Sequence, residues 1–336
     1  MPERSNHMPF HTRTSLQQVL THRWRREAHR LRLWRTRRYQ HRLSIRNWYD
    51  PTARCEDAAI FIGGCGRSGT TLFREVLNRH SQVFCGPETS MFGLPFNPEN
   101  LIEPWSLNRA ETISQVEDAC NLIAFAERFY RSQAALNNKA RWADKTPNNV
   151  RAISKILTWF PNAVFIHLIR DGRDVVCSLR NHPKERIVGG KIQPVVTNRP
   201  IVECATRWLD DTMKGLAFNT HPRYYEVRYE DLVGDFEGTI RSVCSVIGVD
   251  FESSMLIASG NQENSKPGRL VNNKRATAPI SATSVGRWRK DLTSDEMQGF
   301  INIAGELLIA LGYDSNHDWA DSAIQSRPQQ DQLEVR

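Results

Sequence analysis

Residues 58–72 read AAIFIGGCGRSGTTL, and this stretch decides the fold class. Its apolar first part is typical of a short buried strand, which ends at Gly63 and Gly64. Helical spacing of apolar residues begins at Thr70 and continues to about His80. A strand, a glycine-rich loop and a helix N-terminus in this order form a cradle for a phosphate-like anion, because loop N–H groups and the helix dipole point into the same space.

The loop departs from a nucleotide-binding P-loop at one position. Gly64 and Gly69 have the Walker A spacing, but Thr70 replaces the lysine of that motif, and a cation stands three residues earlier as Arg67. This change disfavours ATP or GTP hydrolysis and favours a shorter anion. The alternative is a purely structural turn, which leaves the gathering of a cation, glycines and hydroxyls in one loop unexplained. The hydroxyls expected to bind this anion beside Arg67 are those of Ser68, Thr70 and Thr71.

A second polar group follows the second apolar strand, at residues 163–169. Arg170 stands at the end of that strand, and Ser178 lies about two turns into the helix that follows. These two side chains can approach one anion from two sides. The alternative, equally compatible with these residues alone, is a structural ion pair between Arg170 and Asp171 or Asp174.

Strands and helices alternate along the rest of the chain. We expect helices at 112–136, 148–159, from about 173, at 202–218, 236–247 and 293–311, a strand at 224–229 and a long loop at 261–285. His167 lies inside the second strand and is interpreted as structural. This alternation predicts an α/β fold with three layers, α/β/α, a mainly parallel central sheet and a P-loop-like anion loop. Ligands of such sheets bind at the carboxyl ends of the strands.

Composition limits the class of protein. The 336 residues are 40% hydrophobic and 24% charged, which allows a sizeable core. No apolar stretch approaches the roughly 20 residues of a membrane span, and no signal peptide is evident. The seven cysteines are scattered and form no C-x-x-C, which disfavours a disulfide scaffold or a cysteine zinc site. We therefore expect a soluble, cytoplasmic protein that requires no metal.

The net charge of +8 belongs to the N-terminus. Residues 1–50 contain 12 Arg, no Lys and three acidic residues, so the body of the chain is nearly neutral. We expect three parts: an Arg-rich arm at 1–50, a domain at 51–314 and a loose tail at 315–336. The arm is compatible with contact to an anionic lipid or nucleic acid, with a solvated helix on the body, or with a poorly ordered extension.

Four motifs in order resemble those of the sulfotransferases that use 3′-phosphoadenosine 5′-phosphosulfate (PAPS). They are Gly64–Leu72, Arg170 with Ser178, Arg228–Leu232 and Gly286–Lys290, and the resemblance covers roughly residues 58–312. It implies a sulfotransferase that moves the sulfuryl group of PAPS to a hydroxyl or amine and releases 3′-phosphoadenosine 5′-phosphate (PAP).

The resemblance also implies which residues bind the nucleotide. Arg67, Ser68, Gly69, Thr70 and Thr71 would hold the 5′-phosphosulfate. Arg170 and Ser178 would hold the 3′-phosphate, Tyr229 would lie near the adenine, and Trp288 belongs to the late Gly-x-Trp segment. The Arg-Lys-Gly triplet of cytosolic members is missing, because residues 281–283 are Ser-Ala-Thr. Arg287, Arg289 or Lys290 is expected to substitute for it.

The catalytic residues separate two branches of this family. Pro147 stands where cytosolic members have their catalytic histidine. The segment Cys85-Gly86-Pro87-Glu88-Thr89 is similar to the site of the base in the tyrosylprotein branch and its bacterial relatives. The resemblance therefore implies Glu88 as the base, with Arg67 and Lys145 stabilising charge on the leaving group. This resemblance concerns the catalytic residues and does not establish a tyrosine acceptor.

Other partners and functions remain open at this point. The acceptor is a peptide, a glycan or a small molecule, and the loops at 183–200 and 261–285 are candidate acceptor walls. Their basic residues would attract an acidic acceptor or are simply solvated. No specific nucleic acid is expected. The alternative functions are a P-loop small-molecule kinase, which would need Mg²⁺, and a catalytically silent anion- or nucleic-acid-binding protein.

Overall fold

The computed structural model describes residues 48–93, 95–181, 184–188, 191–195, 198–256 and 284–325, with the backbone alone for 184–188, 191–195 and 324–325. The chain divides into two compact units, residues 1–50 and residues 51–336. The description below concerns the second unit. Residues 1–47, most of the loop at 261–285 and the end of the tail lie outside the described residues, so the expectations for them stay predictions.

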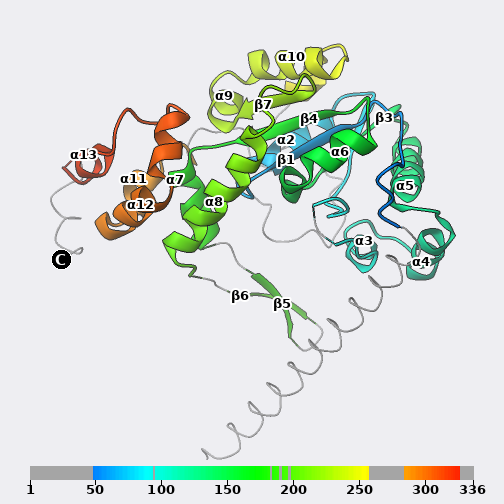
Figure 1. Cartoon of the computed structure of the whole chain (residues 1–336), viewed down its shortest axis with the longest axis horizontal. Coiled ribbons are helices and arrows are strands. Elements are labelled where there is room, and N and C mark those ends of the chain that lie inside the picture. Colours follow the sequence, from blue (N-terminus) through cyan, green and yellow to red (C-terminus); the bar gives the residue numbers. More distant parts are fainter. Residues whose placement is uncertain are drawn as a thin grey trace, which may run out of the picture. The chain divides into compact units, whose positions relative to one another are not determined.

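A five-stranded sheet forms the centre of the second unit (Figure 1). Its strand order is β2-β3-β1-β4-β7, and every neighbouring pair is parallel. The strands are β1 (Ile60–Gly64), β2 (Val83–Cys85), β3 (Arg141–Lys145), β4 (Val164–Ile169) and β7 (Tyr224–Arg228). The predicted parallel sheet is therefore confirmed, and the carboxyl ends of all five strands lie at one edge.

Side chains of β1 alternate between the two faces of the sheet. Ile60 and Ile62 are fully buried in a cluster with α2 (Thr70–Leu77) and α10 (Phe236–Ile247). Phe61 points to the other face, where its ring contacts the rings of Trp142 and Phe160. Both faces are buried, which explains why the strand reads as a continuous apolar run rather than an alternating one.

A second apolar cluster joins the helices that follow β4. It contains α7 (Gly172–Arg180), α8 (Ile201–Leu216), α11 (Trp288–Asp291), α12 (Ser294–Ala310) and α13 (Trp319–Gln325). Helix α13 differs from the expectation of a loose tail beginning at residue 315. Trp319 is only 5% exposed, and its ring meets Trp288 edge-to-face with centroids 4.9 Å apart. Burial of this large aromatic side chain favours an ordered helix in this part of the tail.

The expected helix at 112–136 is two helices, α4 (Arg109–Asp118) and α5 (Leu122–Leu136). The backbone of Ala119 is extended, and the side chain of Asn121 accepts a hydrogen bond from the N–H of Ala124 at 2.9 Å. An asparagine N-cap therefore starts a new helix inside a periodic apolar pattern. Helix α12 begins with a capping box made by Thr293 and Glu296.

Two further segments differ from expectation. The helix predicted at 148–159 consists of the 3₁₀ turn η1 (Pro147–Arg151) and α6 (Ile153–Trp159). The loop predicted at 183–200 contains an antiparallel hairpin, β5 (Lys184–Val188) with β6 (Lys191–Val195). The remaining elements are α3 (Glu99–Ile102), α9 (Tyr229–Gly234) and η2 (Ser253–Leu256). No helix in the described part of the chain is long and apolar enough to cross a bilayer.

His167 is a buried, neutral histidine in the middle of β4. It is 0% exposed, its Nδ1 lies 2.6 Å from the hydroxyl of Tyr224, and a side chain at Gly215 would collide with its ring. Burial lowers the pKa of His167 from its ordinary value of 6.5 to about 3. The interpretation of this residue as structural therefore agrees with its surroundings.

We predict that His167 makes the fold sensitive to mild acid. Below pH 6.5 the imidazole of His167 is protonated in the unfolded chain, whereas in the folded chain it stays neutral down to about pH 3. The free energy of unfolding therefore falls as the pH is lowered through this range. Between pH 7 and pH 5 the loss is about 2 kcal/mol. Urea unfolding at both pH values should show this loss in the wild type and not in His167→Gln. His317→Gln, at a more exposed histidine, is the control, and an unchanged pH dependence in His167→Gln contradicts the prediction.

Candidate active site at the carboxyl edge of the sheet

The glycine-rich loop joins the end of β1 to the start of α2. Gly69 is the N-cap of α2 and has a φ of 87°, in the left-handed region. A Cβ atom at Gly69 would lie 2.4 Å from the ring of Tyr229. Glycine is therefore required here both by the backbone conformation and by the close approach of Tyr229 from β7's carboxyl end. The contact between Gly69 and Tyr229 holds the loop at the carboxyl edge of the sheet, where the sequence predicts it.

Two buried polar atoms at the loop are suited to an anion. Ser68 Oγ and Arg170 Nε are each buried and have no hydrogen-bond partner among the described residues. Ser68 is 1% exposed and Arg170 is 6% exposed. Buried polar groups are normally paired, so two unpaired ones at the carboxyl edge of the sheet indicate a site that a ligand completes. A phosphate or sulfate group has the charge and the acceptor oxygens to do so.

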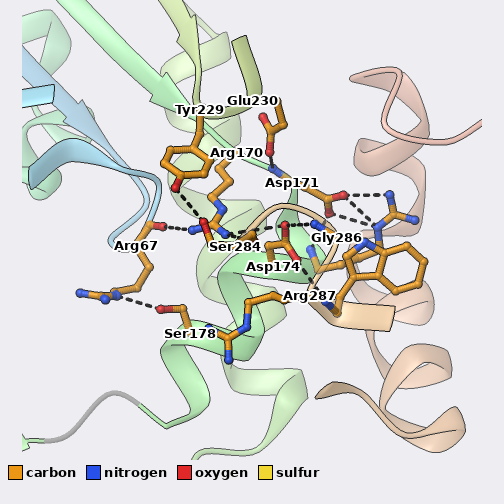
Figure 2. A network of polar contacts seen from close by, with 12 residues as sticks. Arg67, Arg170, Asp171, Asp174, Ser178, Tyr229, Glu230, Ser284, Gly286 and Arg287 are labelled. Atoms are coloured by element: carbon orange, nitrogen blue, oxygen red, sulfur yellow. Dashed lines mark hydrogen bonds and ion pairs between the residues drawn. The ribbon is translucent and has the colours of Figure 1, made fainter. Parts of the chain in front are cut away.

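The structure brings together the two sets of residues predicted to bind the nucleotide (Figure 2). Arg67 Nε donates to Ser178 Oγ at 3.0 Å, and Arg170 Nη1 donates to the backbone oxygen of Arg67 at 3.2 Å. Arg67 has a φ of 78°, an uncommon conformation for a residue with a side chain. The loop after β1 and the strand end of β4 thus form one continuous basic surface.

Asp174 links Arg170 to the chain segment that contains Trp288. Its side chain is 0% exposed, and Oδ2 lies 3.6 Å from Arg170 Nη2. The same carboxylate accepts the backbone N–H of Gly286 at 2.8 Å and that of Trp288 at 3.1 Å (Figure 2). Asp171, the other ion-pair partner considered for Arg170, binds Arg173 instead. The ion pair between Arg170 and Asp174 is therefore part of the candidate site.

Ser284 joins Arg170 to Tyr229. Its backbone oxygen accepts from Arg170 Nη2 at 2.5 Å, and its hydroxyl lies 2.7 Å from the Tyr229 hydroxyl. The guanidinium of Arg170 also stacks over the Tyr229 ring, 4.3 Å from its centre. These contacts place the residues predicted for the 3′-phosphate and the adenine next to each other.

The other side of the loop carries the predicted catalytic pair. Lys145 ends β3, the neighbour of β1, and its Nζ lies 2.5 Å from Glu88 Oε1. Lys145 is 2% exposed, whereas Glu88 is 47% exposed. Glu88 thus presents a carboxylate to solvent while a buried cation holds it. This arrangement can accept a proton from an incoming hydroxyl and place a positive charge beside the loop.

The remaining predicted nucleotide ligands have different surroundings. Thr70 and Thr71 open α2, with Thr70 buried at 4% exposed. The Trp288 side chain is 2% exposed, and Arg173 stacks over its ring at 4.1 Å. Trp288 is therefore a packing residue in this structure, and its binding to a nucleotide stays a prediction. Arg289 also stacks on Trp288, at 4.6 Å, and its assignment to the nucleotide likewise stays a prediction.

Sequence reasoning missed the contacts that two polar residues make at this edge. Asp174 was considered only as an ion-pair partner, and Ser284 was not singled out. The helical spacing of four residues between Arg170 and Asp174 is the signal that could have joined them. Ser284 follows a long loop, so no local pattern indicates its contact with Tyr229.

One cluster at the opposite edge of the sheet has metal-type ligands. Among the described residues, ligand atoms of Cys55, Asp57 and Glu127 lie within 4.8 Å of one another. Arg131 contacts both carboxylates, Asp57 at 2.6 Å and Glu127 at 2.7 Å. A guanidinium therefore already balances the negative charge of this cluster.

Comparisons with known proteins identify the class of this chain. A family model described as the sulfotransferase family matches residues 59–253. Protein-tyrosine sulfotransferase 2 of Gallus gallus is 28% identical over 275 residues, covering 76% of this chain and 69% of that protein. Nodulation protein NoeE of Sinorhizobium fredii is 25% identical over 303 residues, covering 78% of this chain and 68% of that protein.

A solved structure shares the fold. Mouse sulfotransferase SULT7A1, crystallised in a complex with PAP, has a TM-score of 0.50 and 14% identity, and the match covers 83% of this chain and 92% of that one. Because the family model spans more than half of the chain, the protein belongs to the sulfotransferase family. It is an enzyme of sulfuryl transfer, as the resemblance of its motifs implied.

We predict that Asp174→Asn loosens the segment from Ser284 to Trp288. The amide group of asparagine cannot accept both backbone N–H groups, and it leaves the buried Arg170 cation without its anion. The free energy of unfolding should fall by about 3 kcal/mol in urea titrations. Hydrogen exchange at the amides of Gly286 and Trp288 should accelerate. The exposed Asp231→Asn is the matched control, and unchanged exchange at Gly286 would refute the assignment.

Proposed function

We propose that the protein transfers the sulfuryl group of PAPS to a hydroxyl or amine of an acceptor and releases PAP. Family membership supports sulfuryl transfer, and the PAP complex of the mouse sulfotransferase supports this donor. The observation that carries the assignment of the donor site is the pair of unpartnered buried atoms, Ser68 Oγ and Arg170 Nε, at the edge where β1 and β4 end. PAPS supplies the activated sulfuryl group and two anionic ends.

The two anionic ends of PAPS suit the two halves of the basic surface. Backbone N–H groups of the loop, with Ser68, Thr70 and Thr71, would hold the 5′-phosphosulfate over the N-terminus of α2. Arg170 and Ser178 would hold the 3′-phosphate. The hydrogen bond from Arg67 to Ser178 joins these halves. Tyr229 packs against both Gly69 of the loop and Arg170, and its aromatic ring suits the adenine.

The catalytic roles follow from charge and position. Sulfuryl transfer resembles phosphoryl transfer, a loose in-line displacement in which positioning and charge stabilisation dominate. Glu88 would remove the proton of the acceptor. Lys145 and Arg67 would stabilise the negative charge that develops on the oxygen bridging sulfur and phosphate. The ion pair between Lys145 and Glu88 orients the carboxylate before the acceptor arrives.

The acceptor is the open part of this proposal. A protein tyrosine is the first acceptor to test, because the relative from Gallus gallus is a protein-tyrosine sulfotransferase. The hairpin β5–β6 and the loop at 261–285 remain candidate acceptor walls. A cytoplasmic location, a reaction without metal and an anionic contact of the N-terminal arm stay predictions. None of the relatives described above supports the kinase or the catalytically silent alternative.

We predict that Glu88→Gln removes most of the turnover and preserves nucleotide binding. Glutamine still hydrogen-bonds Lys145 but cannot accept the proton, and general-base catalysis typically contributes about 10²–10⁴ in rate. Transfer of labelled sulfuryl from PAPS to a tyrosine peptide measures turnover, and calorimetry with PAP measures binding. Glu103→Gln, at an exposed glutamate, is the control. Full activity of Glu88→Gln would remove Glu88 as the base.

We predict that Arg170→Ala discriminates between nucleotides by their 3′-phosphate. Loss of charge-assisted hydrogen bonds to a phosphate costs about 1.5–3 kcal/mol, which corresponds to about 10- to 150-fold in Kd. Calorimetry should show this loss for PAP and a much smaller one for adenosine 5′-phosphosulfate. Arg241→Ala, an exposed arginine on α10, should leave both affinities unchanged. Equal weakening of both nucleotides would place the 3′-phosphate elsewhere.

A further inference from the structure

A buried polar network lies directly behind the pair of Glu88 and Lys145. Its five members are each at most 1% exposed, and they are Thr89, Tyr130, Asp144, Thr146 and Asn149. A cluster of this kind is costly to bury unless its groups satisfy one another. Nothing in the roles assigned above uses it. The position of the network suggests a role for it, because Thr89 follows Glu88 and because Asp144 and Thr146 flank Lys145.

Asp144 is the acceptor at the centre of this network. Its Oδ1 accepts from Thr89 Oγ1 at 3.2 Å and from Thr146 Oγ1 at 3.0 Å. Its Oδ2 accepts from Asn149 Nδ2 at 3.0 Å. Burial raises the pKa of Asp144, and these donated hydrogen bonds oppose that shift. The carboxylate thereby orients both hydroxyl protons toward itself.

The orientation of the Thr146 hydroxyl has a consequence for Glu88. Because the Thr146 hydroxyl donates its proton to Asp144, the lone pairs of its oxygen are available to accept hydrogen bonds. They accept the backbone N–H of Thr89 at 3.2 Å and that of Ser90 at 3.4 Å. Ser90 has a φ of 52°, so the chain turns sharply just after Glu88. One hydroxyl on the β3 side therefore holds the turn that carries the candidate base.

Tyr130 of α5 closes the network from the other direction. Its hydroxyl lies 2.9 Å from Thr89 Oγ1, and its ring stacks on Trp142 with an interplanar angle of 6°. Thr89 is thus held by its backbone through Thr146 and by its side chain through Asp144 and Tyr130. Glu88 is 47% exposed and would otherwise be free to choose among rotamers. The hydrogen bonds to Thr89 and Ser90 fix the backbone from which the Glu88 side chain projects, and Lys145 holds its carboxylate.

We propose that Asp144 and Thr146 are positioning residues, which set Glu88 against Lys145 by orienting one hydroxyl toward the turn after Glu88. This inference rests on the proposed function, because it assigns the network to the proposed base. The network lies on the β3 side of the anion loop, whereas Arg170 and Ser178 follow β4 on the other side. Its loss should therefore affect the chemical step and spare nucleotide binding.

The test compares two substitutions at one position. Thr146→Val keeps the shape of the side chain and removes the hydroxyl, whereas Thr146→Ser keeps the hydroxyl and removes a methyl group. With labelled PAPS and a tyrosine peptide, we expect Thr146→Val to lower kcat about tenfold or more, since small misplacements of a catalytic group have effects of this size. The Kd for PAP should stay within about twofold. Thr146→Ser should recover most of the lost turnover.

Two further measurements separate positioning from general damage. In the Glu88→Gln background, Thr146→Val should cause no additional loss of kcat, because the group that it positions is already inactive. Hydrogen exchange at the amides of Thr89 and Ser90 should accelerate in Thr146→Val and not in Thr146→Ser. Tyr130→Phe removes only the hydroxyl that contacts Thr89, and it replaces Thr146→Val in this comparison if the latter does not fold.

The outcomes distinguish this inference from the proposed function. Equal turnover of Thr146→Val and Thr146→Ser overturns the positioning role. So does a further loss of kcat when Thr146→Val is added to Glu88→Gln. Absence of both PAP binding and PAPS-dependent transfer by the wild type overturns the proposed function. In that case the amide exchange still decides whether Thr146 holds the turn, and retained protection in Thr146→Val overturns that part as well.

Discussion

The parallel arrangement of the sheet is the constraint on which the rest of the structure depends. Because β3, β1, β4 and β7 run in one direction, their carboxyl ends meet at a single edge. Each strand delivers one group there: Lys145 from β3, the anion loop from β1, Arg170 from β4 and Tyr229 from β7. Backbone hydrogen bonds of the sheet fix the spacing of these groups, so the site is held as rigidly as the core of the sheet.

Local signals explain the parts of the fold that the sequence predicted. The strand–loop–helix at residues 58–72 and the strand before Arg170 are apolar runs with glycine or polar ends, and both were found. Strand β3 was missed because RWADK mixes charges and a tryptophan, although four of its five residues are buried. Its burial comes from its place between β2 and β1 and from contacts with α5 and α2. The break at Asn121 was missed because apolar spacing continues through it.

The sequence yields individual candidate residues for the site, which stay predictions, but not the contacts among them. The hydrogen bond from Arg67 to Ser178 spans 111 residues of sequence, and nothing local indicates it. The expectation placed these residues at opposite ends of one nucleotide, and the structure has them touching. Asp144 and Thr146 flank Lys145, but their part in holding Glu88 depends on a turn 57 residues away. Long-range polar geometry of this kind leaves no periodic signature in a single sequence.

The position of Ser284 bears on how tightly any phosphate is retained. Arg170 already donates to two neutral carbonyl oxygens, those of Arg67 and Ser284. A phosphate that engages Nη2 of this guanidinium would compete with the Ser284 oxygen, so the net gain at that nitrogen is the difference between a charged and an uncharged acceptor. If the nucleotide binds as proposed, this exchange would lower the affinity for PAP. The Ser284 hydroxyl lies 2.7 Å from the Tyr229 hydroxyl, so if the nucleotide binds as proposed, one residue would replace it on departure, with its backbone oxygen at Arg170 and its side chain at Tyr229.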